Sequence, residues 1–176
     1  FAWPCETSRQ RAKKSAEAGI NLQKSLLAFK LVIHLAGKDK LSSGRINLRE
    51  EAIKDVVMVY SDIGDLSESW DYFKKIGENT AYYDLLQKLA FSMAEQGKTD
   101  QTIMVLEKLH SEAALRPSTA QTYKLLAAMH DQKNDQTAVR SVMQRMIDTV
   151  ATTGSPWVRH HGDNKELVQS SRQLCK

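Results

Sequence analysis

The chain has 176 residues, of which 41% are hydrophobic and 26% charged, a balance typical of one soluble domain with a sizeable core. Its net charge is only +4, and the basic residues are spread along the chain, which argues against a nucleic-acid partner. The one basic cluster has no interleaved aromatic residues, and we interpret it as a solvated helix face: Arg9, Arg11, Lys13 and Lys14. No apolar run approaches the roughly 18 residues that a membrane span requires, so we predict no membrane insertion.

The two ends of the chain carry few signals. The chain begins at Phe1 without a basic leader and a following apolar segment, and we interpret it as a processed chain or a fragment. Cys5 and Cys175 lie near opposite ends. A disulfide requires Cα atoms within about 7 Å, and the ends of an elongated helical protein lie far apart, so we predict two free thiols.

Residues 1–46 are predicted to form an N-terminal helical cap. A helical pattern runs from about residue 7 to residue 36 and stops before Gly37. Its dense apolar surface consists of Ile20, Leu22, Leu26, Leu27, Phe29, Leu31, Ile33 and Leu35. Gly19 either divides this stretch into two helices or lies within one long helix.

Residues 47–149 contain three predicted pairs of amphipathic helices. The pairs cover about 48–63 with 65–76, about 80–96 with 99–114, and about 118–132 with 135–149. Within each pair the helices are separated by a residue that tolerates left-handed backbone: Gly64, Gly97 and Asn134. Capping boxes are indicated by Asn47 with Glu50, Asp65 with Glu68, and Ser118 with Gln121.

Apolar residues recur at spacings of three and four in each of these helices, which predicts one buried face per helix. The residues predicted to face inward are Ile53, Val56, Val57 and Tyr60; Trp70, Phe73 and Ile76; Leu86, Leu89, Ala90 and Met93; Ile103, Leu106 and Leu109; Tyr123, Leu126, Ala127 and His130; and Val139, Met143 and Met146.

Residues 150–176 are predicted to form a loop, over 151–163, followed by a capping helix over about 164–174. Within the loop, His160 and His161 precede Asp163. Adjacent histidines with one carboxylate are a weak metal signal, and we interpret them as a solvated loop. No phosphate-binding loop or nucleophile motif is present in the sequence, so we predict no catalytic residues, no metal and no cofactor.

The separations of the three turn residues are 33 (97−64) and 37 (134−97) residues. A helix–turn–helix unit recurring at about 34 residues is the signature of a helical solenoid. No segment shows the alternation of a strand. We therefore predict an all-α fold of about eight helices in a single domain.

The residue pattern of these units resembles the tetratricopeptide repeat (TPR). The matching positions are Ile53, Val56, Val57, Tyr60, Gly64, Ser69, Phe73 and Ile76; Leu86, Leu89, Ala90, Met93, Gly97, Thr102, Leu106 and Leu109; and Tyr123, Leu126, Ala127, His130, Asn134, Val139, Met143 and Met146. The likeness covers roughly residues 50–150. It implies a right-handed α-solenoid of antiparallel helix pairs that binds other proteins.

The repeats depart from the TPR pattern at two places. The small residue expected near the end of each second helix is replaced by Ile76, Leu109 and Met146, and the closing proline occurs once, as Pro117. Segment 45–77 also resembles repeats in cell-envelope and gliding-motility proteins of predatory and social bacteria. That likeness favours the periplasm or cell envelope over the cytoplasm.

The TPR likeness implies a concave groove lined by the first helix of each pair. The groove residues would be Lys54, Met58 and Asp62; Gln87, Phe91 and Glu95; and Lys124, Ala128 and Asp131. Two interpretations of Met58 and Phe91 stay open. They either anchor a partner inside a polar groove or pack against the next unit.

Two functions are favoured by this sequence over a third, which is an enzyme or metal protein that uses His160, His161 and Asp163. The first is a non-enzymatic scaffold that binds a partner peptide or helix in the groove. The alternative is a structural segment of a longer solenoid that mediates self-association or assembly of a cell-envelope complex.

Overall fold

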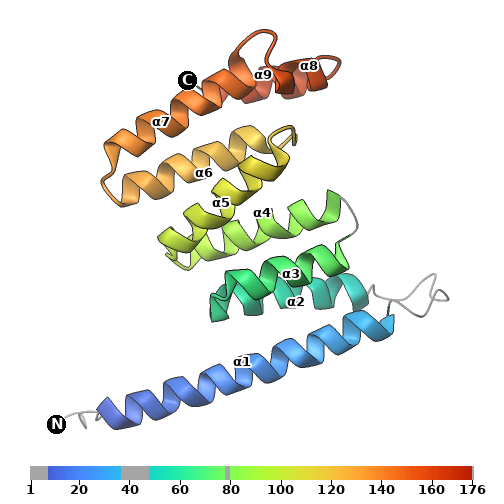
Figure 1. The fold of residues 1–176 in the computed structure, drawn as a ribbon, viewed down its shortest axis with the longest axis vertical. Helices are drawn as coiled ribbons and strands as arrows, with labels where there is room; N and C mark the ends of the chain where they lie inside the picture. Colours follow the sequence, from blue (N-terminus) through green and yellow to red (C-terminus); the bar gives the residue numbers. More distant parts are fainter. Residues whose placement is uncertain (1–7, 37–47, 78–79, 176) are drawn as a thin grey trace. The chain divides into compact units, whose positions relative to one another are not determined.

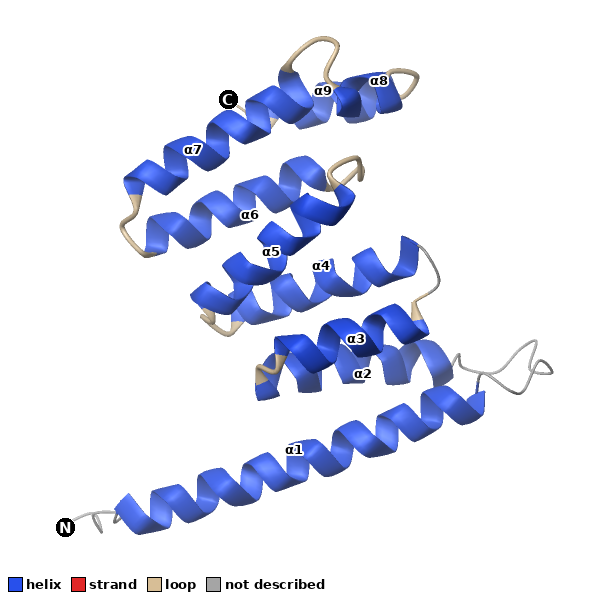
Figure 2. Ribbon diagram, viewed as in Figure 1, coloured by secondary structure: helices blue, strands red, loops and turns tan. Residues whose placement is uncertain are grey.

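The computed structural model describes residues 8–36, 48–77 and 80–175 (Figure 1). Within these ranges the chain consists of helices and turns and contains no strand (Figure 2), which confirms the all-α prediction. No helix in the described ranges is both long and apolar enough to cross a membrane. The predicted stop at Gly37 and the capping residue Asn47 lie outside the described residues, as does Cys5.

The chain divides into two compact units, Phe1–Asp65 and Leu66–Lys176, which we call the N-terminal and C-terminal units. The division falls inside the first predicted helix pair. The N-terminal unit contains α1 (Ser8–Ala36) and α2 (Leu48–Ile63), which pack against each other. Helix α1 continues through Gly19 without a break, so the one-helix alternative is correct.

The C-terminal unit begins with α3 (Leu66–Ile76), which packs on α4 (Thr80–Glu95). Helices α4 and α5 (Thr99–Ala113) form an antiparallel hairpin, and α6 (Thr119–Gln132) with α7 (Gln136–Met146) forms a second. Helix α5 also packs on α6, so the two hairpins are in direct contact. The tight turns of both hairpins lie on the same side, at the left in Figure 1.

All three predicted turn residues adopt the left-handed conformation, and within the C-terminal unit the chain reverses at Gly97 and Asn134. Gly64 has a φ of 79°, Gly97 of 72° and Asn134 of 58°. Asn134 is the one residue other than glycine with positive φ in the described part of the chain. After Gly97 and Asn134, the amides of Lys98 and Asp135 return to the carbonyls of Met93 and His130, which closes each helix end.

Most residues predicted to face inward are buried in the structure. Fully buried side chains include Tyr60, Phe73, Leu86, Leu89, Met93, Leu106, Leu126 and Met146. Four residues of the first two predicted pairs are only half-buried: Ile53, Trp70, Ile76 and Ile103. The third predicted pair differs further. His130 is only half-buried, and its neighbour Met129 is buried instead. In α7, Met146 is buried as predicted, but Val142 is buried whereas Val139 and Met143 are only half-buried.

The prediction of a loop over 151–163 is wrong. Helix α7 continues into a π-helical turn, Ile147–Ala151, and α8 (Pro156–His161) follows before α9 (Lys165–Gln173). Ser155 caps α8 by accepting a hydrogen bond from the amide of Val158, and Pro156 occupies the first turn. A capping serine followed by proline is a helix-start signal, which the glycines on either side obscured.

Trp157 attaches α8 to the rest of the C-terminal unit. Its side chain is fully buried, and its indole Nε1 donates a hydrogen bond of 2.7 Å to the carbonyl of Arg116, in the turn between α5 and α6. The Nε2 atom of His161 lies 2.7 Å from the carbonyl oxygen of Leu115 in the same turn. The C-terminal helices are therefore joined to the α5–α6 turn by two side chains.

The same substitution at two glycines should have opposite effects on stability. An added Cβ would meet no atom within 4 Å at either Gly97 or Gly19. Gly97→Ala should lower the free energy of unfolding by about 1 kcal/mol, because alanine is strained at positive φ. Gly19→Ala should raise it by about 1 kcal/mol, because alanine favours a helix interior. Urea denaturation followed by circular dichroism measures both, and equal signs would contradict the backbone argument.

Candidate partner-binding surface

The predicted groove residues are divided between the two units. Lys54, Met58 and Asp62 lie on α2, at successive turns of one helix face, in the N-terminal unit. The others lie in the C-terminal unit. Gln87, Phe91 and Glu95 share one face of α4, and Lys124, Ala128 and Asp131 share one face of α6.

The two apolar groove residues are solvent-exposed. Met58 is 59% exposed, and Phe91 is 38% exposed. Neither is buried as a core residue of its helix would be. On α4 the neighbouring core residues Ala90 and Met93 are fully buried, whereas Phe91 lies outside this buried face of the helix.

Several polar residues predicted to line the groove take part in local structure. The hydroxyl of Ser118 donates a hydrogen bond of 2.6 Å to the amide oxygen of Gln87, which links the start of α6 to α4. Ser118 makes no side-chain cap to α6, so its predicted capping box is wrong. Asp131 accepts a 2.7 Å bond from the side chain of Gln136, and Lys54 pairs with Glu51 at 2.7 Å.

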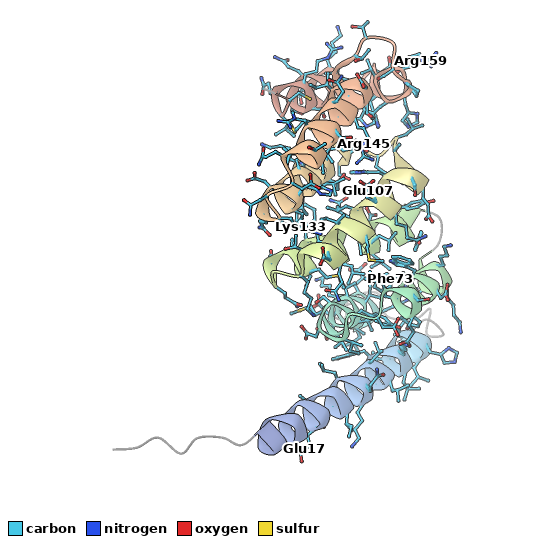
Figure 3. The ribbon with its side chains drawn as sticks, turned by 60° about the vertical axis from the view of Figure 1, so that its left-hand side comes forward. Glu17, Phe73, Glu107, Lys133, Arg145 and Arg159 are labelled. Carbon is cyan, nitrogen blue, oxygen red and sulfur yellow. The ribbon has the colours of Figure 1, made fainter. Side chains whose placement is uncertain are left out.

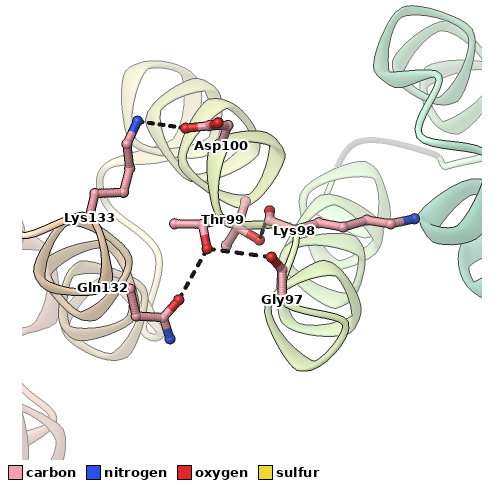
Figure 4. A network of polar contacts seen from close by, with 7 residues as sticks. Gly97, Lys98, Thr99, Asp100, Gln132 and Lys133 are labelled. Carbon is pink, nitrogen blue, oxygen red and sulfur yellow. Dashed lines mark hydrogen bonds and ion pairs between the residues drawn. The ribbon is translucent and has the colours of Figure 1, made fainter.

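Polar side chains also connect the turns of the two hairpins (Figure 4). The hydroxyl of Thr99 donates to the amide oxygen of Gln132 at 3.1 Å. Next to it, the ammonium group of Lys133 lies 2.6 Å from the carboxylate of Asp100. The α4–α5 turn and the α6–α7 turn are therefore joined at two adjacent points.

Two further ion pairs join elements of the C-terminal unit. Arg145 on α7 forms a bidentate pair with Glu107 on α5, with N–O distances of 2.9 and 2.6 Å (Figure 3). Hydrogen bonding by Arg145 lowers the pKa of Glu107, although partial burial opposes this effect. Arg116 pairs with Asp84 near the other end of the α4–α5 hairpin. Together with the turn contacts, these pairs set how the two hairpins are aligned.

His110 lies in a buried polar cluster next to the Glu107–Arg145 pair. Its ring stacks on Tyr123, with 3.9 Å between ring centroids, and its Nε2 atom lies 2.8 Å from the hydroxyl oxygen of Thr122. That hydroxyl donates to the carbonyl of Thr119 at 3.0 Å, so Nε2 of His110 is the donor to Thr122. The Nδ1 atom is then the basic site, and among the described residues it has no hydrogen-bond partner.

Burial of His110 lowers its pKa to about 4, from 6.5. The negative charge of Glu107 acts in the opposite direction, and the positive charge of Arg145 lowers the pKa further. Protonation of Nδ1 would place a charge inside the packing of α5 against α6. The cluster is therefore suited to a neutral histidine that packs and donates one hydrogen bond.

Of the three residues considered for metal binding, His160 and Asp163 are exposed, whereas His161 packs against neighbouring residues. His161 contacts the carbonyl oxygen of Leu115, and its ring lies 4.6 Å from that of Trp157. No group of three or more potential metal ligands occurs among the described residues. Cys175 is a free thiol that lies 3.6 Å from the carbonyl oxygen of Ser171.

Comparisons of the chain with protein-family models, curated proteins and solved structures find no match. The assignment of the helix pairs to a repeat family rests on the residue pattern alone.

The interhelix polar pairs were missed by sequence reasoning. Each joins residues 31 to 38 positions apart, close to the separations of 33 and 37 residues between the three turn residues. A search for complementary polar residues at that spacing would have found Asp84 with Arg116 and Asp100 with Lys133.

Acidification should destabilise the chain through His110. Its pKa is about 6.5 when unfolded and about 4 when folded, so between these values the unfolded state binds more protons. Stability is complete above pH 6.5 and should fall by about 2 kcal/mol between pH 6.5 and 4.5. The lowered pKa of Glu107 adds its own loss only below its ordinary value of 4.5.

The measurement is the free energy of unfolding by urea at several pH values. His110→Gln keeps a donor for Thr122 and should remove most of this pH dependence. His160→Gln, at an exposed position of α8, is the matched control and should leave the profile unchanged. An unchanged profile in the His110 variant would contradict the proposed cause.

Proposed function

We propose that this chain is a non-enzymatic, TPR-like α-solenoid of right-handed twist that binds a partner peptide or helix. The proposed binding surface comprises the exposed faces of α4 and α6. The observation that carries this proposal is the exposure of Phe91, at 38%, on the same face of α4 as Gln87 and Glu95. Aromatic side chains surrounded by polar groups are frequent anchors in protein interfaces.

The polar links between the hairpins support a binding role for this surface. A partner is bound more tightly when the surface that it contacts is already ordered, because less conformational entropy is lost. The α4–α5 and α6–α7 hairpins are joined by the packing of α5 on α6, and the Thr99–Gln132 and Asp100–Lys133 contacts align their turns. Phe91 therefore extends from a framework whose helices are aligned before the partner arrives.

The charges on the two faces favour a polar partner with one apolar anchor residue. Glu95 and Asp131 contribute negative charge, and Lys124 contributes positive charge, all at exposed positions. An extended peptide or a short helix with one buried apolar side chain and polar flanks fits this arrangement.

The proposal is tested by selecting displayed random peptides on the full chain and measuring their affinities for variants. Phe91→Glu should weaken selected peptides at least tenfold, because truncating a central aromatic anchor costs about 2 kcal/mol or more. Met104→Glu is the matched control, because Met104 is 54% exposed on α5, outside the proposed surface.

Thermal unfolding of each variant separates binding from folding. Phe91→Glu should melt within a few degrees of the wild type. If it unfolds, Phe91 belongs to the core and the surface is wrongly assigned. A folded Phe91 variant that binds the selected peptides as tightly as the wild type would place the binding surface elsewhere.

A further inference from the structure

Helix α1 has two apolar faces, and only one of them is buried. The buried face, which packs with α2, includes Leu26 and Ile33, at 1% and 4% exposure. The other face carries Ile20, Leu27, Leu31 and Leu35, at 55%, 66%, 57% and 53% exposure. We call these four residues the outer stripe.

The spacing of the outer stripe is that of a helix-packing seam. Its members are separated by seven, four and four residues, so they lie in one line along the helix. At 100° per residue, the stripe lies roughly opposite Leu26 and Ile33. From Ile20 to Leu35 it extends about 22 Å, which matches a partner helix of about 16 residues.

An exposed stripe of this kind is unusual for a surface helix. A helix with a single covered face is expected to be polar on the other side. Leu27, Leu31 and Leu35 lie at successive turns and make a contiguous apolar surface, which in soluble proteins commonly marks a binding site. Lys24 separates these three from Ile20. The buried face of α1 already makes the contact with α2, so the outer stripe is not needed for that packing.

Charge indicates which kind of partner fits. Helix α1 contains six basic residues (Arg9, Arg11, Lys13, Lys14, Lys24 and Lys30) and one acidic residue (Glu17), a net charge of +5. Lys24 lies within the line of the stripe, four residues after Ile20, and is exposed. A second copy of α1 would bring two helices of like charge together, whereas an acidic helix would neutralise them.

We propose that the outer stripe of α1 docks an acidic amphipathic helix of a partner protein. The partner's apolar side chains would cover Ile20, Leu27, Leu31 and Leu35, and a carboxylate next to them would face Lys24, which is exposed within the line of the stripe. This surface lies in the N-terminal unit and does not depend on the proposed role of α4 and α6. A membrane surface fits less well, because a helix lying on a bilayer needs a broad apolar face, and the stripe is one side chain wide.

The test uses the full chain and a designed peptide. The probe is a dye-labelled helical peptide with Leu at the a and d positions of each heptad and Glu at e and g, which keeps the free peptide from pairing with itself. Fluorescence anisotropy should show saturable binding that weakens as salt is raised. The same peptide with Lys in place of Glu should bind at least tenfold more weakly.

Two variants locate the binding on the outer stripe. Leu27→Gln with Leu31→Gln removes apolar surface without changing charge, and it should weaken the acidic peptide at least tenfold. Met104→Gln, at a comparably exposed position of α5, should leave the affinity unchanged. Thermal unfolding of both variants should match the wild type, because the substituted side chains are exposed.

Several results would overturn the proposal. Absence of saturable binding, equal binding of the basic peptide, or no effect of the Leu27 and Leu31 changes would each do so. A large fall in the melting temperature of that double variant would show that the stripe is covered within the chain. A dimer in light scattering that the double variant dissociates would assign the stripe to a second copy. Sedimentation with phosphatidylserine vesicles, in the absence of peptide binding, would assign it to a membrane.

Discussion

In the C-terminal unit, the apolar face of each central helix is buried against the helix that precedes or follows it along the chain. Leu86 and Leu89 on α4, Leu106 on α5 and Leu126 on α6 are completely buried in this way. Each such side chain contributes roughly 1.5–3 kcal/mol of transfer free energy. Because contacts run between neighbours in sequence, the hairpins follow one another in chain order, and the polar residues are left at their edges and turns.

Those edge residues determine the alignment of the hairpins more than they determine stability. The Asp100–Lys133 pair is largely solvent-exposed, and such pairs contribute little free energy. The Glu107–Arg145 pair is different, because it is bidentate, half-buried and next to the His110–Tyr123 stack. Apolar side chains tolerate small shifts along a helix, whereas two parallel N–H···O bonds tolerate few. The packing of α5, α6 and α7 therefore combines a general hydrophobic attraction with a specific register.

The sequence was sufficient to predict the helices through Gln132 to within one or two residues, because periodicity, Gly64, Gly97 and Asn134 all agree on the boundaries. It was insufficient where two local signals compete. Ser155-Pro156 starts α8, but Gly154 and Gly162 suggested a loop. The Ser118 hydroxyl could cap its own helix or reach Gln87, and only the packing of α6 near α4 decides between them. The exposure of candidate groove residues depends in the same way on neighbours that periodicity does not identify.

Helix α1 shows why apolar content alone is ambiguous. Its apolar residues form one dense set in the sequence, yet in the structure the set separates into Leu26 and Ile33 on one side and Leu27 and Leu31 on the other. Residues adjacent in sequence lie 100° apart on a helix, so a run of apolar residues covers both faces whenever it is long enough. The position of α2 decides which face of α1 is core.

The exposed face of α1 differs from the surface of α4, where the exposed aromatic Phe91 lies among polar neighbours. A line of aliphatic side chains is complementary to another helix, whereas an exposed aromatic among polar groups suits a partner with one apolar contact. The two proposed surfaces would therefore differ in their recognition chemistry.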